Sequence, residues 1–126
     1  DEEYSFNKFL INVKNEKSDI AMIETSAPTF DIDIWFAEKI SKFTEVCVCG
    51  PHITDKNAMD LSKKYSFVKY WLKGEYILSS LKMAETRWDG IYESDIVKDL
   101  DVIPFPFRDY SAVVKYYDTT MPTSRP

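Results

Sequence analysis

The sequence predicts an α/β domain, a flavodoxin-like or Rossmann-like three-layer sandwich whose sheet is mainly parallel. Segments with the apolar spacing of a helix alternate with short segments that are apolar on both faces, and short polar loops join them. Such an alternation is typical of a parallel sheet that is covered by helices on both faces. A chain of 126 residues, 44% of them hydrophobic, is long enough to bury one such core.

The chain opens with a helix and a strand. The helix is expected over residues 5–15, with Ser5 as its N-cap, and these apolar residues recur on one of its faces: Phe6, Phe9, Leu10 and Val13. A strand is expected at 19–24, because this apolar segment is too short for a helix. Residues 25–29 then form a loop with small hydroxyl side chains.

Two more rounds of helix and strand follow, and a further helix completes the pattern. These elements are expected as a helix at 32–43, a strand at 45–49, a helix at 56–64, a strand at 67–72 and a helix at 76–85. Gly50 and Pro51 end the second strand, and Thr54 and Asp55 can cap the helix at 56–64. The residues of that helix expected to face inward are Ala58, Met59 and Leu61.

Beyond Arg87 the periodic pattern ends. Residues 89–92 can form a short strand, and two prolines one residue apart impose an extended course on residues 99–108. The tail from 110 to 126 has no clear period, so we expect it to lie across a neighbouring surface. The sequence therefore predicts an α/β domain over residues 1–98 and a linker and docking arm over residues 99–126.

Charge and cysteine content exclude several classes of protein. A formal net charge of -5 speaks against binding to nucleic-acid phosphates, which relies on cationic side chains. The apolar runs are far shorter than the roughly 20 residues that span a bilayer, and the acidic first residues do not resemble a secretory signal peptide. Two cysteines separated by one residue exclude a disulfide scaffold, so we expect a cytoplasmic protein that binds neither nucleic acid nor membrane.

Ligands of open parallel sheets bind where the carboxyl ends of the strands release their loops. The three loops at that edge offer hydroxyls, flexible backbone, one imidazole and one carboxylate, in the candidate site residues Thr25, Ser26, Thr29, Gly50, His52, Thr54, Gly74 and Glu75. This set suits a polar ligand held by hydrogen bonds, but it contains no recognisable arrangement of nucleophile, base and orienting group. The plainer interpretation is that these loops are only polar turns.

Cys47 and Cys49 lie close to His52 in the sequence and raise the question of a metal site. Residues two apart on a strand point to the same face, so both thiols are expected to be packed under a helix, away from the imidazole. No second pair of cysteines completes a tetrahedral site. We therefore expect buried apolar thiols and no metal, whereas His52 can contact a ligand, bind a metal or face solvent.

Four segments, taken together, carry a resemblance to a known family: IETSAPT at 23–29, VCGPHIT at 48–54, VKYWLKGEY at 68–76 and DLDVIPFPFRD at 99–109. In order and spacing they resemble the signatures of the cobalamin-binding domain in radical S-adenosylmethionine enzymes. Those signatures are a Ser/Thr-rich loop, Gly-Gly-x-His or Gly-Pro-x-His, Gly-Glu-x-Glu, and an Asp-Leu-Asp-x-Ile-Pro-x-Pro linker. The last four residues, TSRP, resemble the Thr-Ser-Arg-Gly that precedes the iron-sulfur Cys-x-x-x-Cys-x-x-Cys motif in these enzymes.

The resemblance implies a corrinoid-binding accessory domain whose cofactor is cobalamin. In it Thr25, Ser26 and Thr29 contact the nucleotide tail, Gly50 and His52 approach the ring or tail, with Thr54 in the same loop, and Gly74 and Glu75 close the pocket. The partner is the radical S-adenosylmethionine barrel of the same parent chain, which holds the iron-sulfur cluster and S-adenosylmethionine and performs methyl transfer or a radical rearrangement. The chain itself contributes no catalytic residue.

The resemblance also concerns the sheet. In a flavodoxin-like order 2-1-3-4-5, the expected strands are the third, fourth and fifth, and the first strand-helix-strand unit is missing. The strand at 19–24 then has an open apolar edge, through which the chain can associate with itself.

Two other functions remain open. The first is a structural or interaction domain of the same fold that binds no cofactor, which Pro51 and the absence of glycine after Glu75 favour. The second is an independent flavodoxin-like or receiver-like module, although the chain lacks the phosphate-binding loop or acidic cluster that such modules need. A groove between the loops at 25–29 and 50–54 favours ligand binding, and a groove filled by Trp35 or Tyr76 favours the structural role.

Overall fold

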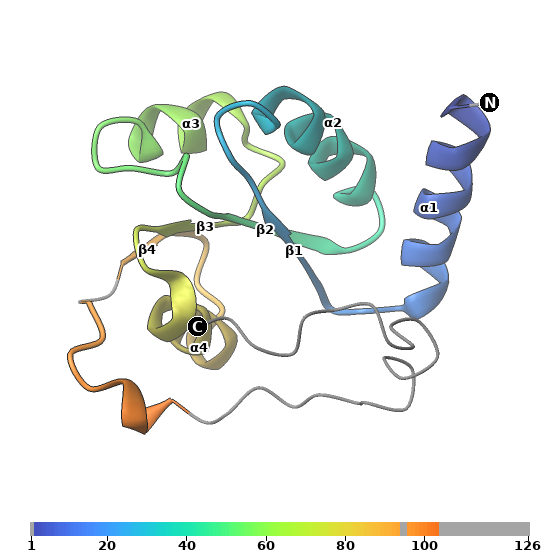
Figure 1. Cartoon of the computed structure of the whole chain (residues 1–126). Coiled ribbons are helices and arrows are strands. Elements are labelled where there is room, and N and C mark those ends of the chain that lie inside the picture. Colours follow the sequence, from blue (N-terminus) through green and yellow to red (C-terminus); the bar gives the residue numbers. More distant parts are fainter. Residues whose placement is uncertain (1, 94–95, 104–126) are drawn as a thin grey trace, which may run out of the picture.

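A single parallel sheet organises the chain. The computed structural model describes residues 2–93 and 96–103 (Figure 1). The strands follow one another across the sheet in sequence order: β1 (Ile20–Glu24), β2 (Glu45–Cys49), β3 (Tyr70–Lys73) and β4 (Gly90–Glu93). Each strand runs parallel to its neighbour. The predicted α/β class with a parallel sheet is therefore confirmed, and the short strand expected at 89–92 is present as β4.

Helices cover the sheet unequally on its two faces. They are α1 (Glu2–Glu16), α2 (Phe30–Ile40), α3 (Ala58–Lys64) and α4 (Tyr76–Thr86). Figure 1 shows α2 and α3 on one face and α4 on the other, while α1 stands beside β1. On its face of the sheet, α4 packs against β3 and β4. This arrangement makes the three layers that the sequence predicts.

The core consists of two apolar clusters, one on each face of the sheet. On the α2 and α3 face, Val46, Val48 and Trp71 of the strands pack against buried residues of α2, among them Phe30, Ile34, Ala37 and Ile40. On the α4 face, the cluster contains Cys47, Cys49, Tyr70, Leu72, Met83 and Tyr92. Since β2 contributes to both clusters, its side chains must be apolar on both faces, which explains its unbroken run of hydrophobic residues after Glu45.

Both thiols are buried free cysteines on the α4 face, as predicted. Burial in the apolar cluster raises the pKa of Cys47 to about 12 and that of Cys49 to about 11. The Cys49 thiol donates to the carbonyl of Ile23 on the neighbouring strand, at 3.7 Å. These thiols therefore pack as small apolar side chains and stay protonated at neutral pH.

Four local predictions need correction. The first helix begins at Glu2, so Ser5 lies inside it and is not its N-cap. The helix at 58–64 has Asn57 at its N-cap position in place of Thr54 and Asp55, and no side chain caps it: the Asn57 side-chain oxygen accepts from the backbone N–H and the hydroxyl of the preceding Thr54, at 2.8 and 3.1 Å. Met59 is 56% exposed, although it was expected to face inward.

The fourth correction concerns the predicted linker. Residues Leu100–Val102 form a short 3-10 turn where an extended course was expected. A backbone N–H bond to the Asp99 carboxylate, donated by Asp101 at 3.0 Å, stabilises this turn and competes with extension. The proline-rich remainder of the linker, from 104, and the tail to 126 lie outside the described residues.

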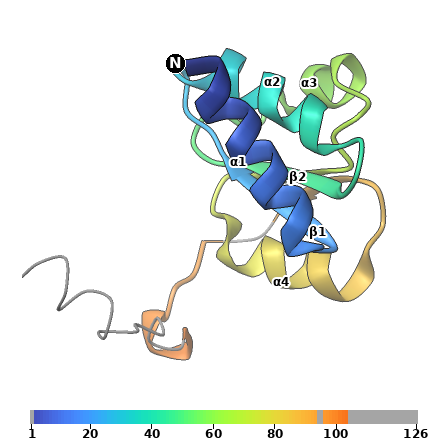
Figure 2. The same cartoon turned by 90° about the vertical axis from the view of Figure 1, so that its right-hand side faces the viewer.

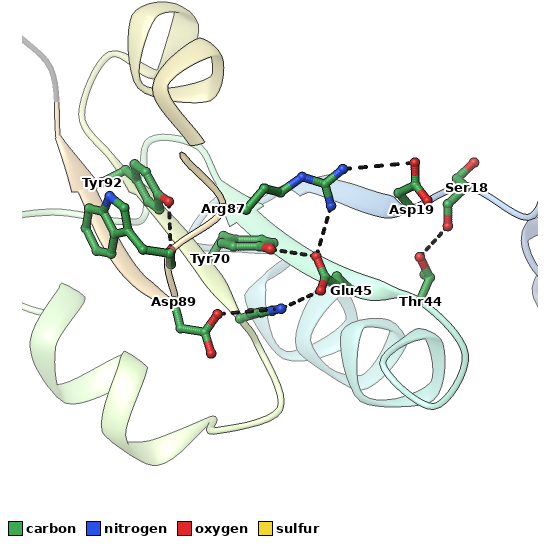
Figure 3. A network of polar contacts seen from close by, with 10 residues as sticks. Ser18, Asp19, Thr44, Glu45, Tyr70, Arg87, Asp89 and Tyr92 are labelled. Carbon is green, nitrogen blue, oxygen red and sulfur yellow. Dashed lines mark hydrogen bonds and ion pairs between the residues drawn. The ribbon is translucent and has the colours of Figure 1, made fainter. Parts of the chain in front are cut away.

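A polar network ties together the amino ends of the strands, at the edge opposite the predicted site (Figure 3). The Glu45 carboxylate accepts from Lys69, from the Tyr70 hydroxyl at 2.5 Å and from Arg87 at 3.2 Å. The bonds from Lys69 and Tyr70 lower the pKa of Glu45. Residues of β2, of β3 and of the connection before β4 thus meet on one carboxylate, which ties this edge of the sheet together.

Candidate functional site

The three predicted loops leave the sheet from one edge. Because all four strands are parallel, residues 25–29, 50–54 and 73–76 follow the carboxyl ends of β1, β2 and β3. That edge is where open parallel sheets bind their ligands. The geometric premise of the predicted site is therefore met, and the contacts within each loop decide which residues a ligand can reach.

In the first loop the hydroxyls already have partners. The Thr25 side chain is buried, and its hydroxyl donates to the Asp33 carboxylate of α2 at 2.8 Å. The hydroxyls of Ser26 and Thr29 lie 2.9 Å apart, and the Thr29 hydroxyl also accepts from the Ser26 backbone N–H at 3.2 Å. These bonds stabilise the loop before α2, and whether its hydroxyls also contact a ligand stays a prediction.

The first and second loops touch each other. The backbone N–H of Thr25 donates to the Cys49 carbonyl at 2.8 Å. Gly50 has a φ of +111°, and a Cβ atom on it would lie 2.3 Å from the Thr25 carbonyl oxygen. Gly50 is therefore required for the close approach of the two segments where they leave β1 and β2.

His52 is held against the protein by its ring and by its backbone. The imidazole lies over the Phe30 ring, with centroids 4.4 Å apart, and the His52 carbonyl accepts from the Asn57 side chain at 2.8 Å. In the part of the chain that the structure describes, no group of three histidine, cysteine or acidic side chains is arranged to hold a metal ion.

A hollow of about 680 Å³ opens between the second and third loops, at the carboxyl ends of β2, β3 and β4. Its lining includes three predicted site residues, Thr54, Gly74 and Glu75. Gly74 has a φ of +69°, and no atom lies within 4 Å of the position that its Cβ would take. The volume falls within the range of about 300–1,000 Å³ that is usual for small-molecule sites.

Lys73 forms the charged centre of this hollow. Its ammonium group lies 2.7 Å from the Asp55 carboxylate and 2.8 Å from the Glu93 carboxylate. The hydrogen bonds that Lys73 donates to Asp55 and Glu93 raise the pKa of Lys73, so it is fully protonated at neutral pH. Since Glu75 adds a further carboxylate to the lining, acidic groups outnumber the one lysine, and the hollow disfavours an anionic ligand.

Tyr76 begins α4 at the border of the hollow and reaches toward the end of β1. A hydrogen bond between its hydroxyl and the Glu24 carboxylate raises the pKa of Tyr76. The Tyr76 ring packs against the thiol cluster on the α4 face. Tyr76 therefore packs on the α4 face of the sheet, near the end of β1, and lines the hollow.

The eight predicted site residues therefore divide into two groups. Thr54, Gly74 and Glu75 line the hollow, although Thr54 also donates to Asn57 and Glu75 accepts from the Ile77 N–H; the remaining five are not part of its lining: Thr25, Ser26, Thr29, Gly50 and His52. The sequence reading did not identify Lys73, Asp55 and Glu93. A usable signal was present for Lys73, because a charged residue directly after a buried strand lies at the ligand-binding edge of a parallel sheet.

Comparisons of the chain with protein-family models, with curated proteins and with solved structures gave no match. The site is therefore described from its own geometry. Among the described residues, no helix has both the length and the apolar character needed to cross a membrane.

Proposed function

We propose that the chain is a corrinoid-binding accessory domain of a larger radical S-adenosylmethionine enzyme, and that the hollow between the loops after β2 and β3 holds part of the corrinoid. The observation that carries this proposal is the 680 Å³ hollow at the carboxyl edge of the sheet, lined by Thr54, Gly74 and Glu75. These three residues belong to the second and third sequence motifs of the resemblance.

The residues around the hollow suit a corrinoid better than a phosphate-anchored ligand. A corrin ring carries carboxamide side chains that both donate and accept hydrogen bonds. The lining holds the Thr54 hydroxyl, the bare backbone of Gly74 and three carboxylates, of which Asp55 and Glu93 also accept from Lys73 and Glu75 accepts from the Ile77 N–H. A flavin mononucleotide, by contrast, needs donors for its phosphate, and the Lys73 ammonium is already held by two carboxylates.

The described residues would act by positioning. When bound, a corrinoid supplies a cobalt centre for methyl transfer or radical rearrangement in the parent enzyme. Thr54 and the Gly74 backbone would orient the edge of the ring, and Lys73 would keep the loops after β2 and β4 together through Asp55 and Glu93. The hollow is smaller than a whole corrinoid, so the barrel of the same parent chain would cover the rest. The buried reduced thiols agree with a cytoplasmic location.

A second candidate function is that of a structural domain that keeps the fold without a cofactor. The contact between Thr25 and Gly50 favours it, because the resemblance assigns both residues to ligand binding. In this case the hollow is an ordinary surface depression, and the domain orients the barrel of its parent.

Titration of the purified chain with hydroxocobalamin separates the two functions. Gly74→Asn places a side chain in the open space of the hollow while tolerating a positive φ, and Lys17→Asn is its matched control, since Lys17 also has a positive φ of 51° but lies in the turn between α1 and β1. Corrinoid binding predicts a spectral shift and pigment retained after desalting for the wild type and Lys17→Asn, and loss of both for Gly74→Asn with an unchanged circular dichroism spectrum. No retained pigment in the wild type, or equal retention in Gly74→Asn, would reject the proposal and favour the structural role.

A further inference from the structure

Lys73 is the one cationic side chain among the described lining residues of the hollow at the carboxyl edge of the sheet. Its ammonium group forms ion pairs with the carboxylates of Asp55 at 2.7 Å and Glu93 at 2.8 Å. Two carboxylates around one ammonium group leave this cluster with a net negative charge. An anionic ligand would therefore have to displace a carboxylate of the protein before it could pair with Lys73.

The N-terminus of α4 is a second feature of the hollow that would ordinarily attract an anion, because the first N–H groups of a helix have no partner within it. Figure 2 shows α4 on the face of the sheet opposite α2 and α3, and of these helices α4 is the one whose first residue, Tyr76, lies in the described lining. Its N-cap residue is Glu75, whose carboxylate accepts from the Ile77 N–H at 3.4 Å. The protein therefore places its own carboxylate where a phosphate would bind.

The rest of the described lining is uncharged. Thr54 contributes a hydroxyl and Gly74 its bare backbone, and the other residues are largely apolar: Pro51, Ile53, Tyr76 and Ile96. A carboxylate has about four lone-pair sites, so each carboxylate in the lining can accept from a further donor while it keeps its bond within the protein. A neutral ligand with N–H donors on an apolar frame therefore suits the hollow better than an anion does.

We propose that the hollow binds carboxamide side chains of a corrin ring and excludes the phosphodiester of the nucleotide tail, so that the chain recognises corrinoids independently of their tail. This inference rests on the proposed corrinoid function and adds which part of the cofactor the hollow selects. A carboxamide is uncharged, and its NH₂ group donates to a carboxylate oxygen. A phosphodiester is an anion without a donor, which carboxylates repel.

The test measures the binding of three corrinoids to the purified chain by equilibrium dialysis at low ionic strength and in excess cyanide. Under these conditions cobalamin and cobinamide both carry two cyanide ligands on cobalt, so they differ in the nucleotide tail alone. Cobyrinic acid keeps the ring but has carboxylates in place of the carboxamides. We expect the dissociation constants of cobalamin and cobinamide to agree within about threefold, and that of cobyrinic acid to be at least about tenfold higher.

A pair of protein variants separates the hollow from the overall negative charge of the chain. Glu75→Gln removes the carboxylate at the N-terminus of α4, and Glu85→Gln is its matched control, because Glu85 lies near the other end of this helix and outside the described lining. Both variants lose one negative charge, and circular dichroism checks that both fold. We expect Glu75→Gln to narrow the difference between cobinamide and cobyrinic acid by at least about threefold, and Glu85→Gln to leave it unchanged.

The outcomes distinguish this inference from the proposed function. If cobinamide binds at least about tenfold more weakly than cobalamin, the tail carries the recognition, and the inference is overturned while the corrinoid function stands. Equal binding of cobinamide and cobyrinic acid, or the same response from both variants, would also overturn the inference alone. If none of the three corrinoids binds, the proposed function is rejected and the inference falls with it.

Discussion

The contact between Gly50 and Thr25 can be tested by adding a single methyl group. In Gly50→Ala, the new Cβ would lie 2.3 Å from the Thr25 carbonyl oxygen and 2.9 Å from the Thr25 nitrogen, at a φ of +111°. The positive φ alone costs about 1–2 kcal/mol for a residue with a Cβ. Displacing Thr25 also weakens its hydrogen bond to Cys49, which adds about 1 kcal/mol. We expect a total loss of about 2–3 kcal/mol in the free energy of unfolding.

Gly74→Ala is the matched control for this substitution. Its φ is +69°, and no atom lies within 4 Å of the new Cβ, so only the conformational cost of about 1 kcal/mol applies. Urea unfolding of both variants, followed by circular dichroism, gives the two free energies from midpoints and slopes. If Gly50→Ala costs no more than Gly74→Ala, the two loops are not in contact, and a groove for a ligand between them becomes available again.

Two further predictions concern groups whose pKa values the fold shifts. Cys47 and Cys49, with pKa values raised to about 12 and about 11 by burial, should react with iodoacetamide in guanidinium chloride but not in the native protein at neutral pH; equal rates in both states would show that they are accessible. The pKa of Glu45 is lowered in the folded state, so its contribution to stability is present above the ordinary glutamate pKa and is lost as the pH falls through the lowered value. Glu45→Gln should therefore destabilise the protein at neutral pH by at most about 1 kcal/mol, because the network is partly exposed and screened. The difference from the wild type should vanish in acid, and a difference that is constant with pH would contradict this explanation.

The fold could be predicted because its strands are short and apolar on both faces. The strand at 45–49 was located to the residue, since its alternate side chains enter two different clusters and all must be apolar. Helix starts were predicted less well. The start of α3 depends on the turn before it, in which the Asn57 side-chain oxygen accepts from Thr54, so the helix begins at Ala58 without a side-chain cap.

The candidate site was only partly predictable, because a loop sequence gives composition but not hydrogen-bond partners. Thr25 has the same hydroxyl as Thr54, yet one lies buried against Asp33 while the other lines the hollow. Gly50 and Gly74 both follow a strand with positive φ. Gly50 lies against the backbone of Thr25, whereas the position of a Cβ on Gly74 is in open space. This difference depends on where the neighbouring loop lies, which the local sequence does not give.

The ion pairs of Lys73 could not be predicted from short sequence motifs. Its two partners are Asp55, in the loop after β2, and Glu93, in β4. Because these residues are far apart in the sequence, no spacing pattern within a short segment could predict the cluster. The side chain of Lys73 is 17% exposed, but its partners Asp55 and Glu93 are 81% and 64% exposed, so solvent screens both ion pairs. Lys73 therefore links the segments that surround the hollow without holding them rigidly.

The most direct test of the proposed site is a map of backbone amide chemical shifts in the 15N-labelled chain with and without hydroxocobalamin. The account predicts shifts at Thr54, Asp55, Gly74 and Glu75, at the carboxyl edge of the sheet, and none at Glu45 or Lys69, at the opposite edge. An unchanged spectrum at saturating corrinoid, or shifts confined to the amino edge, would contradict it.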